Sequence, residues 1–350
     1  MKSNKCTLGD IITQRREKNS GEELPICGVT REGFIPPKQK NADTSLYNVF
    51  YEKDFVFNPA RMELNSIVYN DVYAKAMCSS LYEVFYVHRP DIVLPEFLAL
   101  IVKQKWFTRY CEFLGSGSAR EYCRVANISQ IEIEYPSLDI QKQIVDEYRV
   151  IKERIKIKQL INDNLEVQAL SLYKAELDNC NDDELTNGTI ADIGEFVRGK
   201  NITSAEMQDG IIPVISAGLE PSGTHNKSNV KGPSITISGS GVNAGYVSFH
   251  RNDIWAADCS YNNTSKYIHC LYAILKNMQE KITELQRGTA QPHVYPKEIN
   301  PFEIKIPNEA HLEKIEHLLQ KIFTVIDNNT TEITLLRQMQ SILLTTLSSR

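Results

Sequence analysis

Residues 117–136 read GSAREYCRVANISQIEIEYP, and residues 288–307 read GTAQPHVYPKEINPFEIKIP. Glycine begins and proline ends both stretches, so Gly117 matches Gly288 and Pro136 matches Pro307 at one offset of 171 residues without a gap. In each stretch a loop of small residues is followed by alternating apolar and polar residues before the proline. This match predicts that the chain repeats one structural unit.

Two further blocks extend the repeat toward the N-terminus. Residues 7–11 (TLGDI) match residues 189–193 (TIADI) at an offset of 182, and residues 54–79 match residues 235–260 at an offset of 181. The second match places Cys78 opposite Cys259. The offset falls by ten in the last block, which predicts a longer strand and turn around residues 82–90 of the first copy. Insertions of this kind are typical of surface loops.

The same order of elements is predicted for both copies. Short β-rich runs come first, at residues 55–57 and 66–69 in one copy and at residues 234–237 and 246–249 in the other. Apolar residues at helical spacing then predict one helix in each copy, over roughly residues 95–113 and 265–285. A final strand leads to the proline.

Beyond each proline the pattern becomes that of a coiled coil. Apolar residues recur in alternating steps of three and four over about four heptads, which is typical of a coiled-coil seam. Lys158 and Asn329 interrupt this seam at equivalent positions, and such polar residues fix register and pairing at a cost in stability. At 1.5 Å per residue, roughly 35–40 residues make a rod on the order of 55 Å long, which predicts a spacer. The apolar seam residues are Ile144, Tyr148, Ile151, Ile155, Leu165 and Leu172 in the first helix, and Ile315, Leu319, Ile322, Ile326, Ile333, Leu336 and Leu343 in the second.

The seam leaves two pairings open. One is a coiled coil between two copies of the chain, and the other is a pair formed by the two helices of one chain. Two helices of equal length in a single chain favour the intramolecular pair.

Composition indicates a globular protein of the cytoplasm. The chain has 350 residues, enough for two domains, with 42% hydrophobic and 24% charged residues. Its eight cysteines form no Cys-x-x-Cys pair, so we expect reduced thiols and neither a disulfide framework nor a zinc site. No apolar run approaches the roughly 20 residues of a membrane helix, and residues 1–6 lack a signal-peptide core. The net charge of −5 argues weakly against nucleic acid, although a basic cleft can coexist with acidic outer faces.

Catalytic motifs are not found in the sequence. Residues 239–245 (GSGVNAG) resemble a phosphate loop, but β-like residues flank them on both sides, so we predict a turn between strands. The chain has no Asn-Pro-Pro-Tyr or Asp-Pro-Pro-Tyr methyltransferase motif, no Walker loop, no Gly-x-Ser-x-Gly elbow and no His-Glu-x-x-His. Its histidines do not pair at metal-ligand spacing. We therefore expect a non-catalytic chain without a metal or cofactor of its own.

Polar and basic residues near the turns are candidates for contacting DNA. Arginine can hydrogen-bond guanine at two points, asparagine and glutamine can do the same with adenine, and lysine binds phosphates. For each one, an ordinary solvated surface residue is the alternative interpretation. The base-contact candidates are Arg61, Asn65, Ser118, Arg120 and Arg124 in the first copy and Ser238, Ser240, Asn243, Thr289, Gln291 and His293 in the second, and the phosphate-contact candidates are Lys103, Lys105 and Arg109.

Equivalent loops in the two copies carry unlike side chains. The Gly-Ser-Ala and Gly-Thr-Ala loops keep the same backbone type, while Arg120 in one is replaced by Gln291 in the other. Copies that share a frame but differ in exposed side chains are expected to read different sequences.

In the order of these motifs the chain resembles the specificity subunits of Type I restriction–modification enzymes. The resemblance is carried by LGDI at 8–11 and IADI at 190–193, FNPAR at 57–61, GTAQP at 288–292 and YPSLDIQKQI at 135–144. Single motifs are weak, but their duplicated arrangement is specific and covers nearly the whole chain. The chain departs from the pattern where the second helix begins NEAHL at 308–312, without the Leu-x-x-Gln spacing of Leu138 and Gln141, and where Val294-Tyr295 stand in place of Cys123-Arg124.

The resemblance implies a mixed α/β fold with two target-recognition domains, residues 1–136 and 179–307. Two long antiparallel coiled-coil helices, residues 137–178 and 308–350, would separate these domains in a pseudo-two-fold arrangement. Each domain would read one half of an asymmetric bipartite site in double-stranded DNA.

Catalysis would then belong to partner subunits. The resemblance implies two methyltransferase (modification) subunits that bind S-adenosylmethionine and methylate adenine, with restriction and translocase subunits added to them, and no membrane. The alternatives are the specificity subunit of a related modification system outside Type I and a stand-alone structural or regulatory DNA-binding protein.

Overall fold

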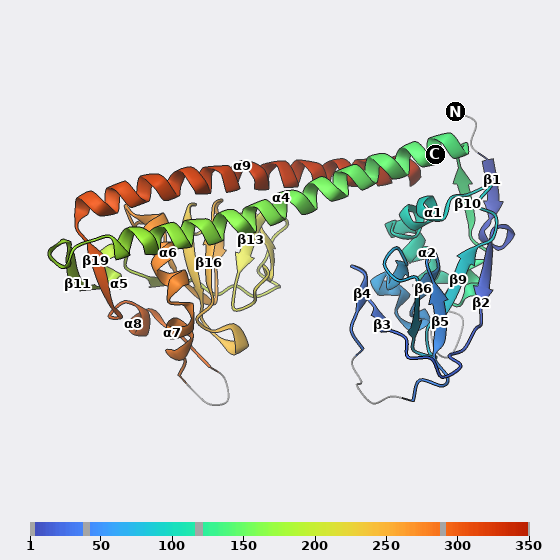
Figure 1. The fold of residues 1–350 in the computed structure, drawn as a ribbon, viewed down its shortest axis with the longest axis horizontal. Coiled ribbons are helices and arrows are strands. Elements are labelled where there is room, and N and C mark those ends of the chain that lie inside the picture. The colour runs from blue at the N-terminus through green and yellow to red at the C-terminus, as the bar shows by residue number, and fades with distance from the viewer. Residues whose placement is uncertain (1–3, 38–42, 116–121, 288–291, 349–350) are drawn as a thin grey trace. The chain divides into compact units, whose positions relative to one another are not determined.

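The computed structural model describes residues 4–37, 43–115, 122–287 and 292–348 (Figure 1). Its contacts divide the chain into two compact units. Unit 1 comprises residues 1–156 and 334–350, and unit 2 comprises residues 157–333. Both units combine β-sheets with helices, which confirms the mixed α/β class. No helix in the described part of the chain is long and apolar enough to cross a membrane.

Unit 1 contains two four-stranded sheets and one two-stranded sheet. Their strand orders are β2-β9-β6-β7, β4-β3-β8-β5 and β1-β10. The strands are β1 (Asn4–Thr7), β2 (Ile12–Arg15), β3 (Ile26–Val29), β4 (Phe34–Ile35), β5 (Asn48–Tyr51), β6 (Phe55–Phe57), β7 (Ile67–Tyr69), β8 (Lys75–Cys78), β9 (Glu83–Val87) and β10 (Glu132–Tyr135). The helical segments are η1 (Leu8–Asp10), η2 (Pro59–Leu64), α1 (Pro95–Val102), α2 (Lys105–Gly115), α3 (Val125–Ile128) and the start of α4 (Leu138–Asp178).

Unit 2 contains the sheets β12-β18-β15-β16, β14-β13-β17 and β11-β19. The strands are β11 (Leu185–Thr189), β12 (Val197–Arg198), β13 (Ile212–Ile215), β14 (Gly223–His225), β15 (Ser234–Ser238), β16 (Val247–His250), β17 (Trp255–Ala256), β18 (Cys259–Asn262) and β19 (Glu303–Pro307). The helical segments are η3 (Asp182–Glu184), α5 (Ile190–Ile193), η4 (Gly241–Asn243), α6 (Ile268–Asn277), α7 (Gln279–Glu284), α8 (Pro296–Ile299) and most of α9 (Glu309–Ser348).

The strand orders confirm the internal repeat. The sheet β12-β18-β15-β16 has the order of β2-β9-β6-β7, and each unit also has one parallel strand pair, β3 with β8 and β13 with β17. The final strand of each copy pairs antiparallel with the opening strand at the same register. Thr7 lies opposite Glu132 in unit 1, and Thr189 lies opposite Glu303 in unit 2.

The equivalence of Cys78 and Cys259 was wrong. Cys78 ends β8 opposite Cys27, and the corresponding parallel pair in unit 2 places Ala256 opposite Ile215. Cys259 instead begins β18, which takes the place of β9 in its sheet. An ungapped match missed this difference because four residues connect β8 to β9, whereas only two connect β17 to β18.

The single helix predicted in each copy is two helices. In unit 1, α1 ends at Val102 and α2 begins at Lys105, and in unit 2 the break falls at Met278 between α6 and α7. Every residue from Phe97 to Val102 is buried, whereas α2 buries only Phe107, Cys111 and Gly115 along one stripe. The chain therefore bends between a helix that is buried on all sides, α1, and a helix that is buried on one side only, α2. Neither glycine nor proline marks the bend, so no local sequence signal predicts it.

Gln141 anchors the first long helix to unit 1. Its side chain is fully buried, its amide oxygen accepts the Leu94 backbone N–H at 2.9 Å, and its amide nitrogen donates to the carbonyls of Ile92 and Pro136. Leu312 stands at the equivalent position in α9, and it is buried in the hydrophobic core of unit 2. The Leu-x-x-Gln pattern is thus a polar anchor that the second copy replaces with an apolar one.

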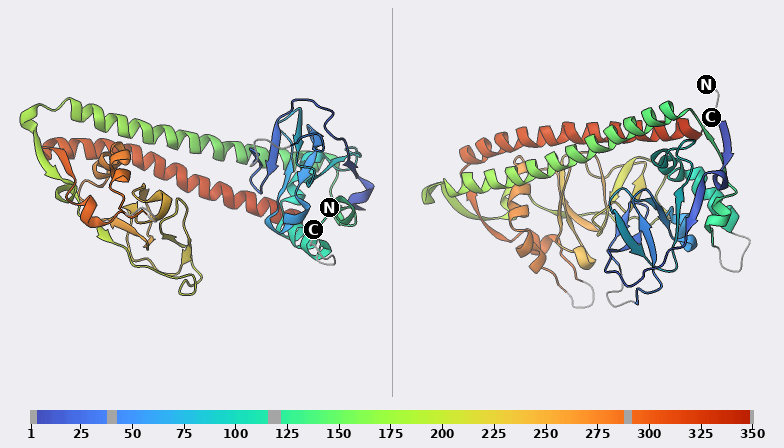
Figure 2. Two further views of the ribbon diagram at one scale, coloured as in Figure 1. Left: turned by 90° about the horizontal axis from the view of Figure 1, so that it is seen from below. Right: turned by 45° about the vertical axis from the view of Figure 1, so that its right-hand side comes forward.

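Within unit 2 the helices α4 and α9 run antiparallel and side by side (Figure 2). Glu176 near the end of α4 pairs with Lys314 near the start of α9, and Lys158 pairs with Glu332, each at 2.7 Å. Of the predicted seam residues, five are buried, namely Ile155, Ile315, Leu319, Ile333 and Leu336. The others are half-buried, namely Ile144, Tyr148, Ile151, Leu165, Leu172, Ile322, Ile326 and Leu343.

Candidate nucleic-acid interface

Arg61 is an exposed candidate in the first copy. It lies in η2, the turn that joins β6 to β7, where Asn58 caps the turn by accepting the Ala60 N–H at 3.1 Å. The backbone of Arg61 departs from helical geometry (φ −139°, ψ 36°), and its carbonyl accepts the Ser66 hydroxyl at 2.7 Å. Its side chain is exposed, and the described contacts include no hydrogen-bond or ion-pair partner for the guanidinium group. Hydrogen bonds therefore fix the backbone of Arg61, while its guanidinium group remains free to contact DNA.

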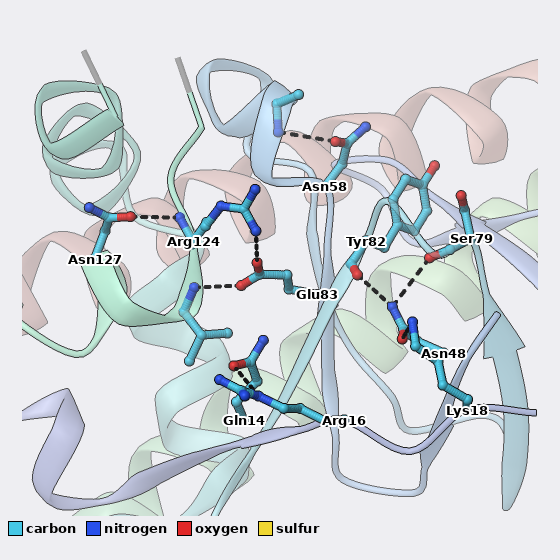
Figure 3. A network of polar contacts seen from close by, with 12 residues as sticks. Gln14, Arg16, Lys18, Asn48, Asn58, Ser79, Tyr82, Glu83, Arg124 and Asn127 are labelled. Carbon is cyan, nitrogen blue, oxygen red and sulfur yellow. Dashed lines mark hydrogen bonds and ion pairs between the residues drawn. The ribbon is translucent and has the colours of Figure 1, made fainter. Parts of the chain in front are cut away.

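Glu83 organises the polar contacts beside that turn (Figure 3). One carboxylate oxygen of Glu83 accepts the Val125 N–H at 2.7 Å, and the other pairs with the Arg124 guanidinium at 3.2 Å. Asn127 accepts the Arg124 backbone N–H at 2.9 Å. The Glu83 carboxylate is largely buried, while 63% of the Arg124 side chain remains exposed. Arg124 is thus oriented by an acidic residue and still reachable from solvent.

Asn65 takes a structural position. It is buried in a left-handed conformation (φ 50°), and its amide nitrogen donates to the Val102 carbonyl and to the Thr108 hydroxyl at 3.1 and 2.7 Å. These contacts join the end of η2 to α1 and α2. Because the side chain is buried and occupied, a base edge would not reach it in this conformation.

The three basic residues expected at helical spacing do not share one helix. Lys105 and Arg109 lie one turn apart on α2, and both are exposed. Arg109 lines a hollow beside Pro59 and Met62 of η2. Lys103 precedes the bend after α1 and lines a different cavity. Only Lys105 and Arg109 therefore remain together as phosphate-contact candidates.

In the second copy, residues 239–245 form a turn between β15 and β16, as predicted. Gly241 and Gly245 adopt positive φ values of 74° and 87°, a region that favours glycine. Ser238 and Ser240 are buried, with the Ser238 hydroxyl donating to the Ala217 carbonyl and the Ser240 hydroxyl donating to Asp258. Asn243 is half-buried in η4. The two serines fix the turn, and their hydroxyl groups face the protein.

In the second copy, Arg198, Asp258 and Tyr295 form a cluster beside this turn. The Arg198 guanidinium pairs with the Asp258 carboxylate and lies 5.1 Å from the centre of the Tyr295 ring. A Cβ atom at Gly239 would collide with this guanidinium, so a glycine is needed there for Arg198 to lie against the turn. His293 stacks on the same Tyr295 ring, with the two ring centroids 5.5 Å apart and the ring planes 9° from parallel.

His293 also closes the ends of the second small-residue loop. Its backbone N–H and carbonyl exchange two hydrogen bonds of 2.9 Å with Arg287. In addition, Gly241 donates its N–H to the Pro292 carbonyl at 3.0 Å, which ties the loop to the turn at 239–245. Unit 1 has a comparable tie, because the Cys123 N–H donates to the Pro59 carbonyl at 3.0 Å. Ser118, Arg120, Thr289 and Gln291 lie outside the described residues.

The sequence reasoning missed the pair Arg16 and Arg198. The match of residues 7–11 with 189–193 continues at the same offset, and it pairs Arg16, directly after β2, with Arg198, the last residue of β12. Arg16 is exposed, and its Nε donates to Gln14 at 3.0 Å (Figure 3). Extending the first matched block by five residues would have found both.

The described residues include no group of histidine, cysteine, aspartate or glutamate side chains arranged to hold a metal ion. Each cluster instead consists of an arginine, a nearby carboxylate and a turn whose backbone is fixed by hydrogen bonds. Arginine side chains held in this way suit the recognition of bases and phosphates.

Comparison with known proteins gives consistent results. Residues 9–167 and 183–338 each match the model of the Type I restriction modification DNA specificity domain. The specificity subunit of the Type I restriction enzyme MjaIX from Methanocaldococcus jannaschii is 25% identical over 300 residues, which cover 73% of this chain and 68% of that protein. The crystal structure of a Type I restriction–modification S subunit from M. genitalium shares the fold, with a TM-score of 0.59 and 18% identity over 99% of this chain and 96% of that one.

Proposed function

The chain belongs to the Type I restriction modification DNA specificity family, and on that premise we propose that it selects the DNA site of such a system. Chains of this family are the non-catalytic specificity components. We propose further that each copy reads one half of an asymmetric bipartite site in double-stranded DNA. The domains that do so are residues 1–136 and 179–307, with residues 137–178 and 308–350 as the spacer helices.

The observation that carries the proposal is a common frame with unlike exposed residues. Thr7 and Thr189 occupy the same register against the final strand, and each donates its backbone N–H to the carboxylate three residues on, Asp10 or Asp192. The turns in these frames carry different exposed side chains, Arg61 in the first and Val242, which is 92% exposed, in the second. A shared frame with different side chains suits the reading of two different half-sites.

The differences between the two copies also suggest which residues contact DNA. In the first copy we propose Arg61 and Arg124 for base contacts and Lys105 and Arg109 for phosphate contacts. In the second copy we propose Arg198 and His293, which both lie against the Tyr295 ring. The loop residues Ser118, Arg120, Thr289 and Gln291 complete the proposed contacts.

We also propose that this chain holds two methyltransferase subunits, which bind S-adenosylmethionine and methylate adenine, and that restriction and translocase subunits join them. The paired helices α4 and α9 are the proposed scaffold and spacer. This assignment of partners follows from the family and from the long helices that flank each copy.

Co-expression with the neighbouring methyltransferase subunit tests the proposal. The methylated adenines of the host genome are mapped by single-molecule sequencing, with and without this chain. One bipartite motif that requires the chain supports the proposal. Methylation that does not change when the chain is removed contradicts it and favours a stand-alone DNA-binding protein.

A further inference from the structure

Unit 1 contains a cavity that its proposed DNA contacts do not use. The cavity has a volume of about 610 Å³ and lies between α1, α4 and the end of β7. Tyr69, Lys103, Tyr148 and Lys152 line it, and we call it the α1–α4 cavity. Cavities of this size commonly hold small organic ligands.

The second copy carries apolar residues at the matching sequence positions. At the offset of 171 residues, Lys103 corresponds to Ile274 and Lys152 corresponds to Phe323, and each of these apolar residues is 4% exposed. The Phe323 ring packs against Phe249 and Tyr272, with centroid distances of 5.0 and 5.7 Å. Two core residues of one copy are thus two lysines around a cavity in the other. The two lysines are therefore specific to the first copy.

Among the described contacts, the two lysines differ from two other cations around the cavity in forming no ion pair. The other charged lining residues are the cations Arg31, Lys53 and Arg149 and the carboxylates Glu32, Glu52, Asp71 and Glu96. Lys53 pairs with Glu96 at 3.7 Å, and Arg149 pairs with Asp146 at 2.8 Å. The described contacts give no such ion pair to Lys103 or Lys152. Desolvation and the nearby Lys152 charge lower the pKa of Lys103, and only Asp71 opposes them. A bound anion would relieve the repulsion between the two ammonium groups.

The walls of the cavity suit an aromatic or sugar group. Tyr148 and Tyr69 are half-buried and come from opposite sides, α4 and β7. The Tyr69 hydroxyl donates to Glu96 at 3.1 Å, which holds the ring in place. Aromatic rings beside lysines that form no ion pair suit a molecule that combines an apolar part with a phosphate.

We propose that the α1–α4 cavity binds a phosphate-bearing ligand, with Lys103 and Lys152 as the phosphate-binding residues. Two sources share this chemistry, a free nucleoside phosphate and a backbone phosphate of DNA. The inference goes beyond the proposed function, because it concerns α4 and α1 and requires no base recognition. It can therefore fail while the specificity role stands, and the converse also holds.

Calorimetric titration of the full chain with ATP and with inorganic pyrophosphate at low salt tests the inference, and fluorescence anisotropy with duplex DNA tests the second source. The variant is Lys152→Met, and the matched control is Lys156→Met, an exposed lysine one turn further along α4 that does not line the cavity. We expect saturable binding with one site per chain, weakened at least tenfold by Lys152→Met and less than twofold by Lys156→Met.

The pattern of losses identifies the source. Loss of ATP or pyrophosphate binding assigns the site to a free phosphate compound, and loss confined to duplex DNA assigns it to the DNA backbone. The inference is overturned if no probe binds, or if Lys152→Met and Lys156→Met behave alike. Thermal melting guards against a folding defect, since removing one of two repelling charges should leave the melting temperature unchanged or higher. If Lys152→Met lowers the melting temperature, the binding measurements are repeated with Lys152→Gln, and the same outcomes support or overturn the inference.

Discussion

The Nζ atom of Lys158 donates a hydrogen bond to Oδ1 of Asn329 at 2.8 Å, and these two residues hold the same position in the two copies of the repeat. Equivalent residues of two repeated antiparallel helices can meet at one position only. The contact is extended by Glu332, which pairs with Lys158 at 2.7 Å, and by Asn162, which accepts the Asn329 amide N–H at 2.8 Å. A one-turn slip of either helix would break all three contacts.

We predict that Asn329→Ala destabilises the protein by about 1–3 kcal/mol, because buried polar partners lose their hydrogen bonds. Urea unfolding followed by circular dichroism measures the change. Asn328→Ala, at the exposed neighbouring residue, is the control and should change the free energy of unfolding by less than about 0.5 kcal/mol. Equal effects of the two variants would show that the polar contact does not fix the helix pair.

A second prediction concerns Gln141, which bonds three backbone groups from a fully buried position. Gln141→Leu removes these bonds and leaves the Leu94 N–H and two carbonyls without their partner. We expect a loss of about 2–4 kcal/mol in the free energy of unfolding. Gln143→Leu changes an exposed glutamine two residues away and serves as the control. If Gln141→Leu is as stable as the unmodified protein, a leucine anchors the helix in the first copy as well as Leu312 does in the second, and the prediction is wrong.

The sequence predicted the repeat well because the signals of the repeat are local. The Thr-x-x-Asp openings and the final strand before each proline kept their spacing, and both recur at the same register in the structure. The bend between α1 and α2 had no such signal, since it follows from a change in burial around Val102. The ungapped match was wrong where the connections between strands differ in length, as at Cys78 and Cys259.

The candidate interface was harder to predict, because polarity and turn position do not reveal which way a side chain points. Asn65, Ser238 and Ser240 have the same chemistry as DNA-contacting residues, but tertiary packing turns them inward. Arg198 was overlooked because its partners, Asp258 and Tyr295, are distant in sequence.

A third prediction follows from His250 in β16. Burial lowers the pKa of its imidazole from 6.5 to about 4, and the ring lies 2.7 Å from the Thr236 hydroxyl. The unfolded chain takes up a proton near pH 6.5 while the folded chain does not. Stability from the neutral ring is therefore complete above pH 6.5 and falls as the pH drops toward 4, by at most about 3 kcal/mol.

Urea unfolding at pH 7.5 and pH 5 measures this effect. His250→Gln keeps a polar side chain but does not titrate, so its free energy of unfolding should depend less on pH than that of the unmodified protein. His317→Gln, at an exposed position of α9, should retain the original dependence. The same slope in all three proteins would show that His250 titrates normally in the folded state.

We predict that the two copies contribute separately to one recognition site. Arg61→Ala removes a free guanidinium from the first copy, and Arg198→Ala removes the paired one from the second. Removing an arginine that contacts a base edge typically costs about 1–3 kcal/mol and relaxes specificity at that position. Each variant should therefore relax one half of the recognised site and leave the other half unchanged.

Genome-wide mapping of methylated adenine in cells that express the methyltransferase subunit with the unmodified chain, with Arg61→Ala or with Arg198→Ala is the most direct measurement. We predict a bipartite motif in which Arg61→Ala relaxes one half and Arg198→Ala relaxes the other. A continuous motif, or one whose two halves change together in both variants, would contradict the reading of two half-sites by two copies of one frame.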